Sequence, residues 1–168
     1  MELSGQIIGI IAMCANILSF QCKSNKRLVL VIGVGASLFA VSYLMLGQPS
    51  AAAFNIISAI CSIACLKDKL KNKFVFGVIV ALFLAATWVT YGGWWSLMLM
   101  AAQIVSSYTI MFKSGTFIRN ARLFFISPVW LINNTIMCFT VGGIICEVIS
   151  MVSVIVSFIR YKSTGFED

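Results

Sequence analysis

The chain has 168 residues, of which 61% are hydrophobic and only 10% charged, with a mean hydropathy of +1.02 and a net charge of +7. A soluble domain is roughly half apolar and a quarter charged, so this composition indicates a polytopic membrane protein. Because the sequence contains no histidine, Ser-His-Asp and Cys-His catalytic sites and His-containing metal sites are excluded.

Seven apolar runs follow one another along the chain, separated by charged or turn-rich segments. Each run is long enough to cross ~30 Å of hydrocarbon as a helix. We therefore predict an all-α polytopic membrane protein that forms a single membrane domain over residues 1–168. The predicted transmembrane helices cover residues 5–21, 28–46, 50–66, 74–91, 95–112, 123–139 and 142–160.

The segments between the runs alternate in charge. All twelve lysines and arginines lie in KSNKR (23–27), KDKLKNK (67–73), KSGTFIRNAR (113–122) and the tail RYKSTGFED (160–168), whereas GQPS, TYGG and TVGG are uncharged. Short loops rich in Lys and Arg stay in the cytoplasm. The pattern predicts that the N-terminus lies outside and the C-terminus inside, and it explains the net charge without nucleic acid as a partner.

A shift of 92 residues superimposes the first three runs on the last three without a gap. It brings Phe20 onto Phe112, Arg27 onto Arg119 and NIISAICSI onto EVISMVSVI. Two fused three-helix units can keep the same orientation only if one extra helix joins them. We therefore predict a 3+1+3 arrangement of parallel repeats: a first triple-helix unit (5–66), a linker helix (74–91) and a second unit (95–160).

Polar residues within the last runs and the third run form the candidate site. By helical rise, Glu147 lies ~20 Å from Arg160. Asn134 lies ~18 Å from Arg122 and Asn55 ~18 Å from Lys67, so the three share a depth. An ionisable residue inside a membrane normally faces the bundle interior and marks a solute or proton path. We predict that Asn55, Glu147, Asn134, Asn133 and Trp130 bind substrate; the alternative is that the asparagines join neighbouring helices and Trp130 fills the core.

Pro128 lies inside the sixth run. Proline removes one backbone hydrogen bond and clashes with the carbonyl four residues earlier, so it should kink the helix below Trp130. The kink is either a gating hinge or a static bend.

Two stretches resemble known families. SFQCKSNKR, at the end of the first run, is similar to the triple-helix unit of PQ-loop and SWEET-type transporters, with Gln21 at the motif's glutamine and Phe20 where its proline would stand. Closer is the bacterial inner-membrane YgjV family, which LGQPSAAAFNIISAI (46–60) and NNTIMCFTVGGIICEVISMVSVIVSFIRYK (133–162) resemble, most specifically at Gly142, Gly143 and Glu147. The resemblance implies a multi-pass protein of the bacterial inner (cytoplasmic) membrane.

We predict a transporter of small polar solutes, sugar-like or other small metabolites, that works by alternating access around the Asn/Glu site. The alternative is a non-transporting membrane sensor or scaffold. An intramembrane enzyme is least favoured, because it would need a second ionisable group near Glu147. The expected partners are the solute and the lipid bilayer, with no cofactor or metal, and the sequence leaves open whether copies of the chain form a homo-oligomer.

Overall fold

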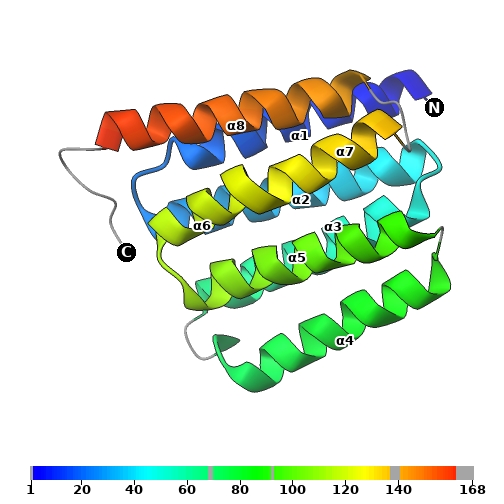
Figure 1. The fold of residues 1–168 in the computed structure, drawn as a ribbon, viewed down its shortest axis with the longest axis horizontal. Helices are drawn as coiled ribbons and strands as arrows, with labels where there is room; N and C mark the ends of the chain where they lie inside the picture. Colours follow the sequence, from blue (N-terminus) through cyan, green and yellow to red (C-terminus); the bar gives the residue numbers. More distant parts are fainter. Residues whose placement is uncertain (1, 68–69, 92, 137–140, 162–168) are drawn as a thin grey trace.

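The computed structural model describes residues 2–67, 70–91, 93–136 and 141–161, and over these ranges the chain is helical (Figure 1). Within the described residues, five helices are long and apolar enough to cross a membrane, and α4 is shorter but also apolar. The observed bounds lie within a few residues of six of the seven predicted runs. In chain order the elements are α1 (Glu2–Phe20), α2 (Asn25–Met45), α3 (Pro49–Leu66), α4 (Lys73–Val89), α5 (Trp94–Phe112), α6 (Gly115–Ala121), η2 (Arg122–Ile126), α7 (Ser127–Ile136) and α8 (Val141–Tyr161).

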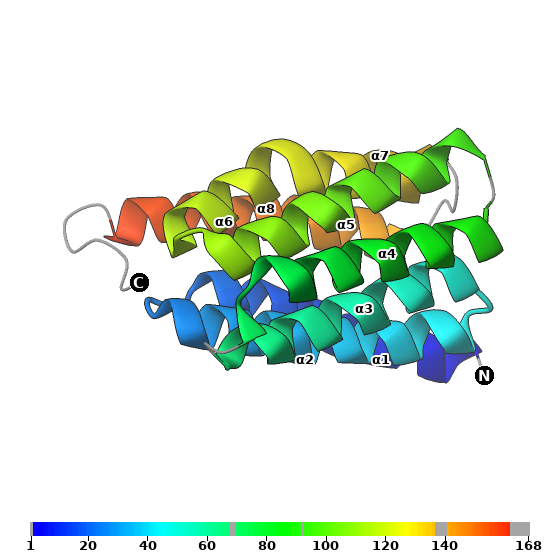
Figure 2. The same cartoon turned by 90° about the horizontal axis from the view of Figure 1, so that it is seen from below.

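The helices form two layers, which Figure 2 shows from the side. In one layer α2 packs between α1 and α3; in the other, the continuous run of α6, η2 and α7 packs between α5 and α8. Across the layers α1 contacts α8 and α3 contacts α5, while α4 packs at one edge against α3 and α5. In Figure 1 the α1–α2 and α5–α6 connections lie at one end of the bundle, and the α2–α3 and α4–α5 connections lie at the other.

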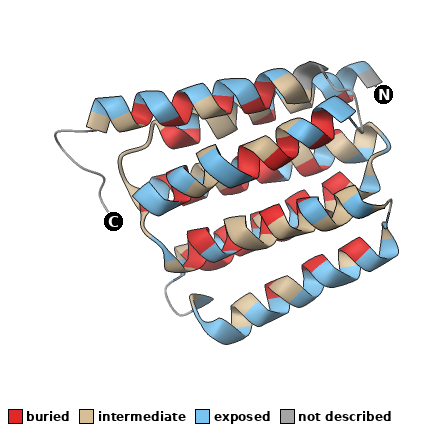
Figure 3. Ribbon diagram, viewed as in Figure 1, coloured by how far each residue is buried: buried red, intermediate tan, exposed pale blue. Residues whose placement is uncertain are grey.

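The outer surface of the bundle is apolar. Figure 3 shows exposed residues along the outward faces of the helices, and large hydrophobic side chains are among the most exposed. A water-soluble monomer rarely exposes contiguous apolar area on this scale, whereas lipid tails accept it. The most exposed large hydrophobic side chains are Trp88, Val89, Phe74, Trp94, Phe124, Ile159 and Leu3.

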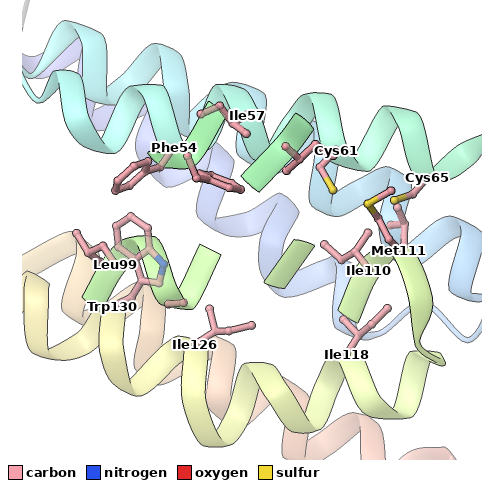
Figure 4. Close-up of a cluster of buried hydrophobic side chains, with 14 of the residues drawn as sticks. Phe54, Ile57, Cys61, Cys65, Leu99, Ile110, Met111, Ile118, Ile126 and Trp130 are labelled. Carbon is pink, nitrogen blue, oxygen red and sulfur yellow. The ribbon is translucent and has the colours of Figure 1, made fainter. Parts of the chain in front are cut away.

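The interior combines an apolar cluster with small polar residues. Figure 4 shows Phe54 of α3 facing Leu99 of α5 and Trp130 of α7, and Cys61 further along α3 facing Ile110 of α5. Phe54 also meets Phe83 of α4 edge-on, with ring centroids 5.9 Å apart. Buried serines add small polar groups to the interior, where small side chains let helix backbones approach. They include Ser19, Ser42, Ser62, Ser107, Ser150 and Ser157.

The sixth span differs from its prediction. The helical run starts at Gly115 rather than at 123, so most of the segment 113–122 is helix and not a basic loop. The chain turns at Ser114, whose backbone is extended, and no proline follows until Pro128. As a result, Arg119 and Arg122 belong to the helix, and Arg119 is completely buried.

Candidate solute site in the centre of the bundle

A cavity of about 70 Å³ lies between the two layers. Side chains from α1, α2, α3, α5, η2, α7 and α8 line it, so both layers contribute. Its lining is polar at many points, among them Tyr43, Asn55, Gln103, Arg122, Asn134 and Glu147. Buried polar groups of this kind cost free energy in a membrane unless they are paired or hydrated, so their convergence on one cavity marks it as the candidate site.

Glu147 does not face the cavity alone. Its carboxylate accepts hydrogen bonds from Nη2 of Arg122 at both oxygens, each at 3.0 Å, and only 6% of the residue is exposed. The two side chains form an ion pair that lines the cavity. The sequence interpretation placed Arg122 in a loop at the membrane boundary. It failed because the helix begins earlier than predicted and because helical rise ignores the length of an arginine side chain.

A wide helical turn orients Arg122. In η2 the N–H of Ser127 bonds to the carbonyl of Arg122, five residues back rather than four. This π-helical turn directly precedes Pro128, whose ring would clash with the carbonyl four residues before it in a regular helix. The turn therefore accommodates the proline inside the span.

The same turn determines which residues share the cavity face. Trp130 and Asn134 follow Arg122 by eight and twelve positions, which in a regular α-helix puts them ~80° and ~120° away from it. One extra residue in a turn removes ~100°, so both come within ~20° of Arg122. All three residues line the cavity.

Asn55 of α3 and Gln103 of α5 supply amides to the cavity wall. The Asn55 amide nitrogen donates to the carbonyl of Ala51 at 2.8 Å, which leaves its amide oxygen as the remaining acceptor. The Gln103 amide oxygen accepts from the hydroxyl of Ser58 at 3.0 Å, so α3 and α5 are joined across the layers beside the cavity.

The predicted site residues divide into two groups. Asn55, Glu147, Asn134 and Trp130 all line the cavity. Asn133 is buried but is not part of the lining, and neither is Pro128. Trp130 also belongs to the apolar cluster of Figure 4. It therefore packs in the core and forms part of the cavity wall as well.

A second polar cluster joins the layers at the end of α1. Arg119 donates to the carbonyls of Phe20 at 3.3 Å and Cys22 at 2.6 Å, and Tyr161 donates to the carbonyl of Gln21 at 2.7 Å. The Gln21 amide in turn donates to the Ser153 hydroxyl at 2.8 Å. The last carbonyls of a helix have no partner within it, so α6 and α8 satisfy the end of α1. We call these four side chains the α1 clamp.

Arg122 is the site residue that the sequence interpretation missed. A usable signal was present, because charged residues within a membrane usually pair with one another, and Arg119 and Arg122 belong to the basic segment that comes before Glu147 in the sequence. The π-helical turn that aims Arg122 has no comparable sequence signal.

Fold, surface and cavity together define a polytopic α-helical membrane protein with a charged, polar centre. Residues 3–165 match the Imp-YgjV family, described as a bacterial inner membrane protein, so the chain belongs to this family and lies in the bacterial inner membrane. No curated protein and no solved structure matches the chain.

Proposed function

We propose that the protein is a carrier that moves a small polar solute across the inner membrane by alternating access. The observation that supports this most is the polar cavity between the two layers, with Asn55, Asn134 and the Arg122–Glu147 pair in its wall. Pockets that bind small molecules combine apolar walls with a few convergent polar groups, and this cavity has both.

The helix arrangement fits a pair of rocking units. The first unit of the proposal is α1, α2 and α3, the second is α5, the α6–α7 run and α8, and α4 links them. Each unit has its second helix in the middle. A twofold axis along the helices would exchange α1 with α5 and α3 with α8, and so would relate the α1–α8 contact to the α3–α5 contact; both contacts are present. Asn55 and Glu147, equivalent under the 92-residue shift, then meet at one cavity, and the substrate lies at the interface between repeats.

The α1 clamp sets a requirement on this movement. It ties α1 of the first unit to α6 and α8 of the second, at the end of the bundle where Lys23, Lys26 and Arg27 lie. With the N-terminus outside and the C-terminus inside, that end is cytoplasmic. Opening the cavity toward the cytoplasm would break the clamp, and opening it outward would leave the clamp intact.

Flux through the purified protein in liposomes tests the proposal. Uptake of a panel of small polyols, sugars, amino acids and carboxylic acids is compared for wild type, Asn55→Ala and Glu147→Gln, with Ile56→Ala on the exposed face of α3 as the matched control. The proposal expects at least one solute whose uptake falls tenfold or more in both site variants and stays unchanged in the control. Uptake of every solute at the rate of protein-free liposomes would contradict it.

A membrane sensor or scaffold is the second candidate. One observation favours it: Glu147 already has a hydrogen-bonding partner in Arg122, so the carboxylate needs no solute to satisfy it. The flux experiment separates the two, because a sensor would bind a solute without moving it. Binding would appear as thermal stabilisation of the detergent-solubilised protein by ligand, without uptake.

A further inference from the structure

We propose that the solute is a small zwitterion, a molecule that carries one carboxylate and one ammonium group, as α-amino acids do. The proposal deepens the carrier function above and rests on it. It comes from the charges in the cavity wall. The sequence interpretation placed one charged residue there, Glu147, whereas the structure also places Arg122 there.

The cavity wall contains one cation and one anion. Arg122 and Glu147 both line the cavity, and they are the charged residues among its described lining. Their pairing makes the wall neutral overall. A solute with a net charge would therefore leave one charge unmatched in a site of low dielectric, whereas a zwitterion adds none.

The guanidinium of Arg122 has donors to spare. Its Nη2 donates to the Glu147 carboxylate, but its Nε is buried and has no hydrogen-bond partner among the described residues. An orphaned N–H beside a cavity is a site for an acceptor, and a charged N–H forms a stronger hydrogen bond with a carboxylate oxygen than with a neutral hydroxyl. The carboxylate of the solute would therefore bind at Nε of Arg122.

The ammonium group has a matching place. Two carboxylates around one guanidinium would carry an excess negative charge, which an ammonium next to Glu147 removes. The Asn55 amide oxygen, left as an acceptor by the bond from its nitrogen to Ala51, lines the same cavity and can accept a further ammonium N–H. Each of the four charges would then lie beside an opposite one.

A matched panel of two- and three-carbon solutes tests the charge requirement in proteoliposomes at neutral pH. L-Alanine is the zwitterion, propionate has only the carboxylate, ethylamine has only the ammonium, and propionamide has neither charge. We expect L-alanine uptake at least tenfold above that of each of the other three after subtraction of the protein-free leak. Propionate or propionamide uptake equal to that of L-alanine would overturn the proposal.

Paired variants test the two residues without leaving a bare charge. Arg122→Gln/Glu147→Gln keeps the wall neutral and should lower L-alanine uptake at least tenfold, while the charge exchange Arg122→Glu/Glu147→Arg should restore it at least threefold above that double variant. Arg160→Gln, at the exposed end of α8, is the control and should behave as wild type. L-alanine uptake unchanged in the Gln/Gln protein would refute the proposal.

The same panel separates this inference from the carrier function. If L-alanine fails but a neutral polyol moves in an Asn55-dependent way, the carrier stands and the zwitterion does not. If no solute moves faster than through protein-free liposomes, both fall.

Discussion

Arg119 and Arg122 lie one turn apart on the same helical run, yet they are satisfied in different ways. Arg119 is completely buried and donates to the backbone carbonyls of Gly115, Phe20 and Cys22. Arg122 lines the central cavity and pairs with a titratable carboxylate. Backbone carbonyls do not titrate and cannot swing away as a side chain can, so Arg119 holds α6 in place against the end of α1. A carboxylate in a cavity can exchange partners, so Arg122 is suited to bind a solute.

The largest expected effect on stability follows removal of Arg119. Arg119→Met removes the donors to the carbonyls of Phe20 and Cys22, and we expect the free energy of unfolding to fall by about 3 kcal/mol. Equilibrium unfolding in detergent micelles measures the change. Arg160→Met, which removes an exposed arginine, should change stability by less than about 0.5 kcal/mol. Equal losses for the two variants would remove the distinction between a clamp and a surface charge.

The Arg122–Glu147 pair should show strong energetic coupling. A double-mutant cycle of Arg122→Gln and Glu147→Gln should give a coupling energy of about 1–2 kcal/mol, because each single variant strands a buried charge and the double variant strands none. The cavity exposes part of the Arg122 side chain, which keeps the value below that of a dry ion pair. Additive single effects in the same unfolding assay would show that the two charges do not interact.

Pro128 should act on this pair through the wide turn. Pro128→Ala restores the missing N–H and lets the helix close to a regular α-helix, which turns Arg122 away from the face of Trp130 and Asn134. We expect the coupling energy between Arg122 and Glu147 to fall below about 0.5 kcal/mol in this background. Pro49→Ala at the first turn of α3 is the control, since proline there requires no such adjustment. Undiminished coupling in Pro128→Ala would mean that the proline does not set the turn.

The smallest effect belongs to the outer bonds of the α1 clamp. Tyr161→Phe removes one hydroxyl that donates to the Gln21 carbonyl, and hydrogen bonds within membrane proteins are each worth about 0.6 kcal/mol. We expect a loss of that size in the unfolding assay. Tyr91→Phe, on an exposed side chain, should cause none. A loss as large as that of Arg119→Met would make Tyr161 as important to the clamp as Arg119.

Hydropathy predicted most of the helices, because the length of an apolar run is a strong signal in a membrane protein. Asn55, Asn134, Trp130 and Glu147 could be placed at one cavity because polar residues are rare in lipid. The sixth span was wrong at its start, since an arginine inside a helix and an arginine in a loop look alike in sequence. Arg122 was missed for that reason, and also because a π-helical turn shifts the periodicity on which face assignments depend.

Solvent access to the cavity tests the central claim most directly. In a cysteine-free background, Asn55→Cys and Ile56→Cys are exposed to a charged, water-soluble thiol reagent in native membranes. Asn55 lines the cavity, and the neighbouring Ile56 is exposed on the apolar surface. We predict modification at position 55, slowed by solute, and none at position 56, because the thiolate that reacts does not form in lipid. No reaction at position 55 would mean that the centre of the bundle is dry and that the carrier function is wrong.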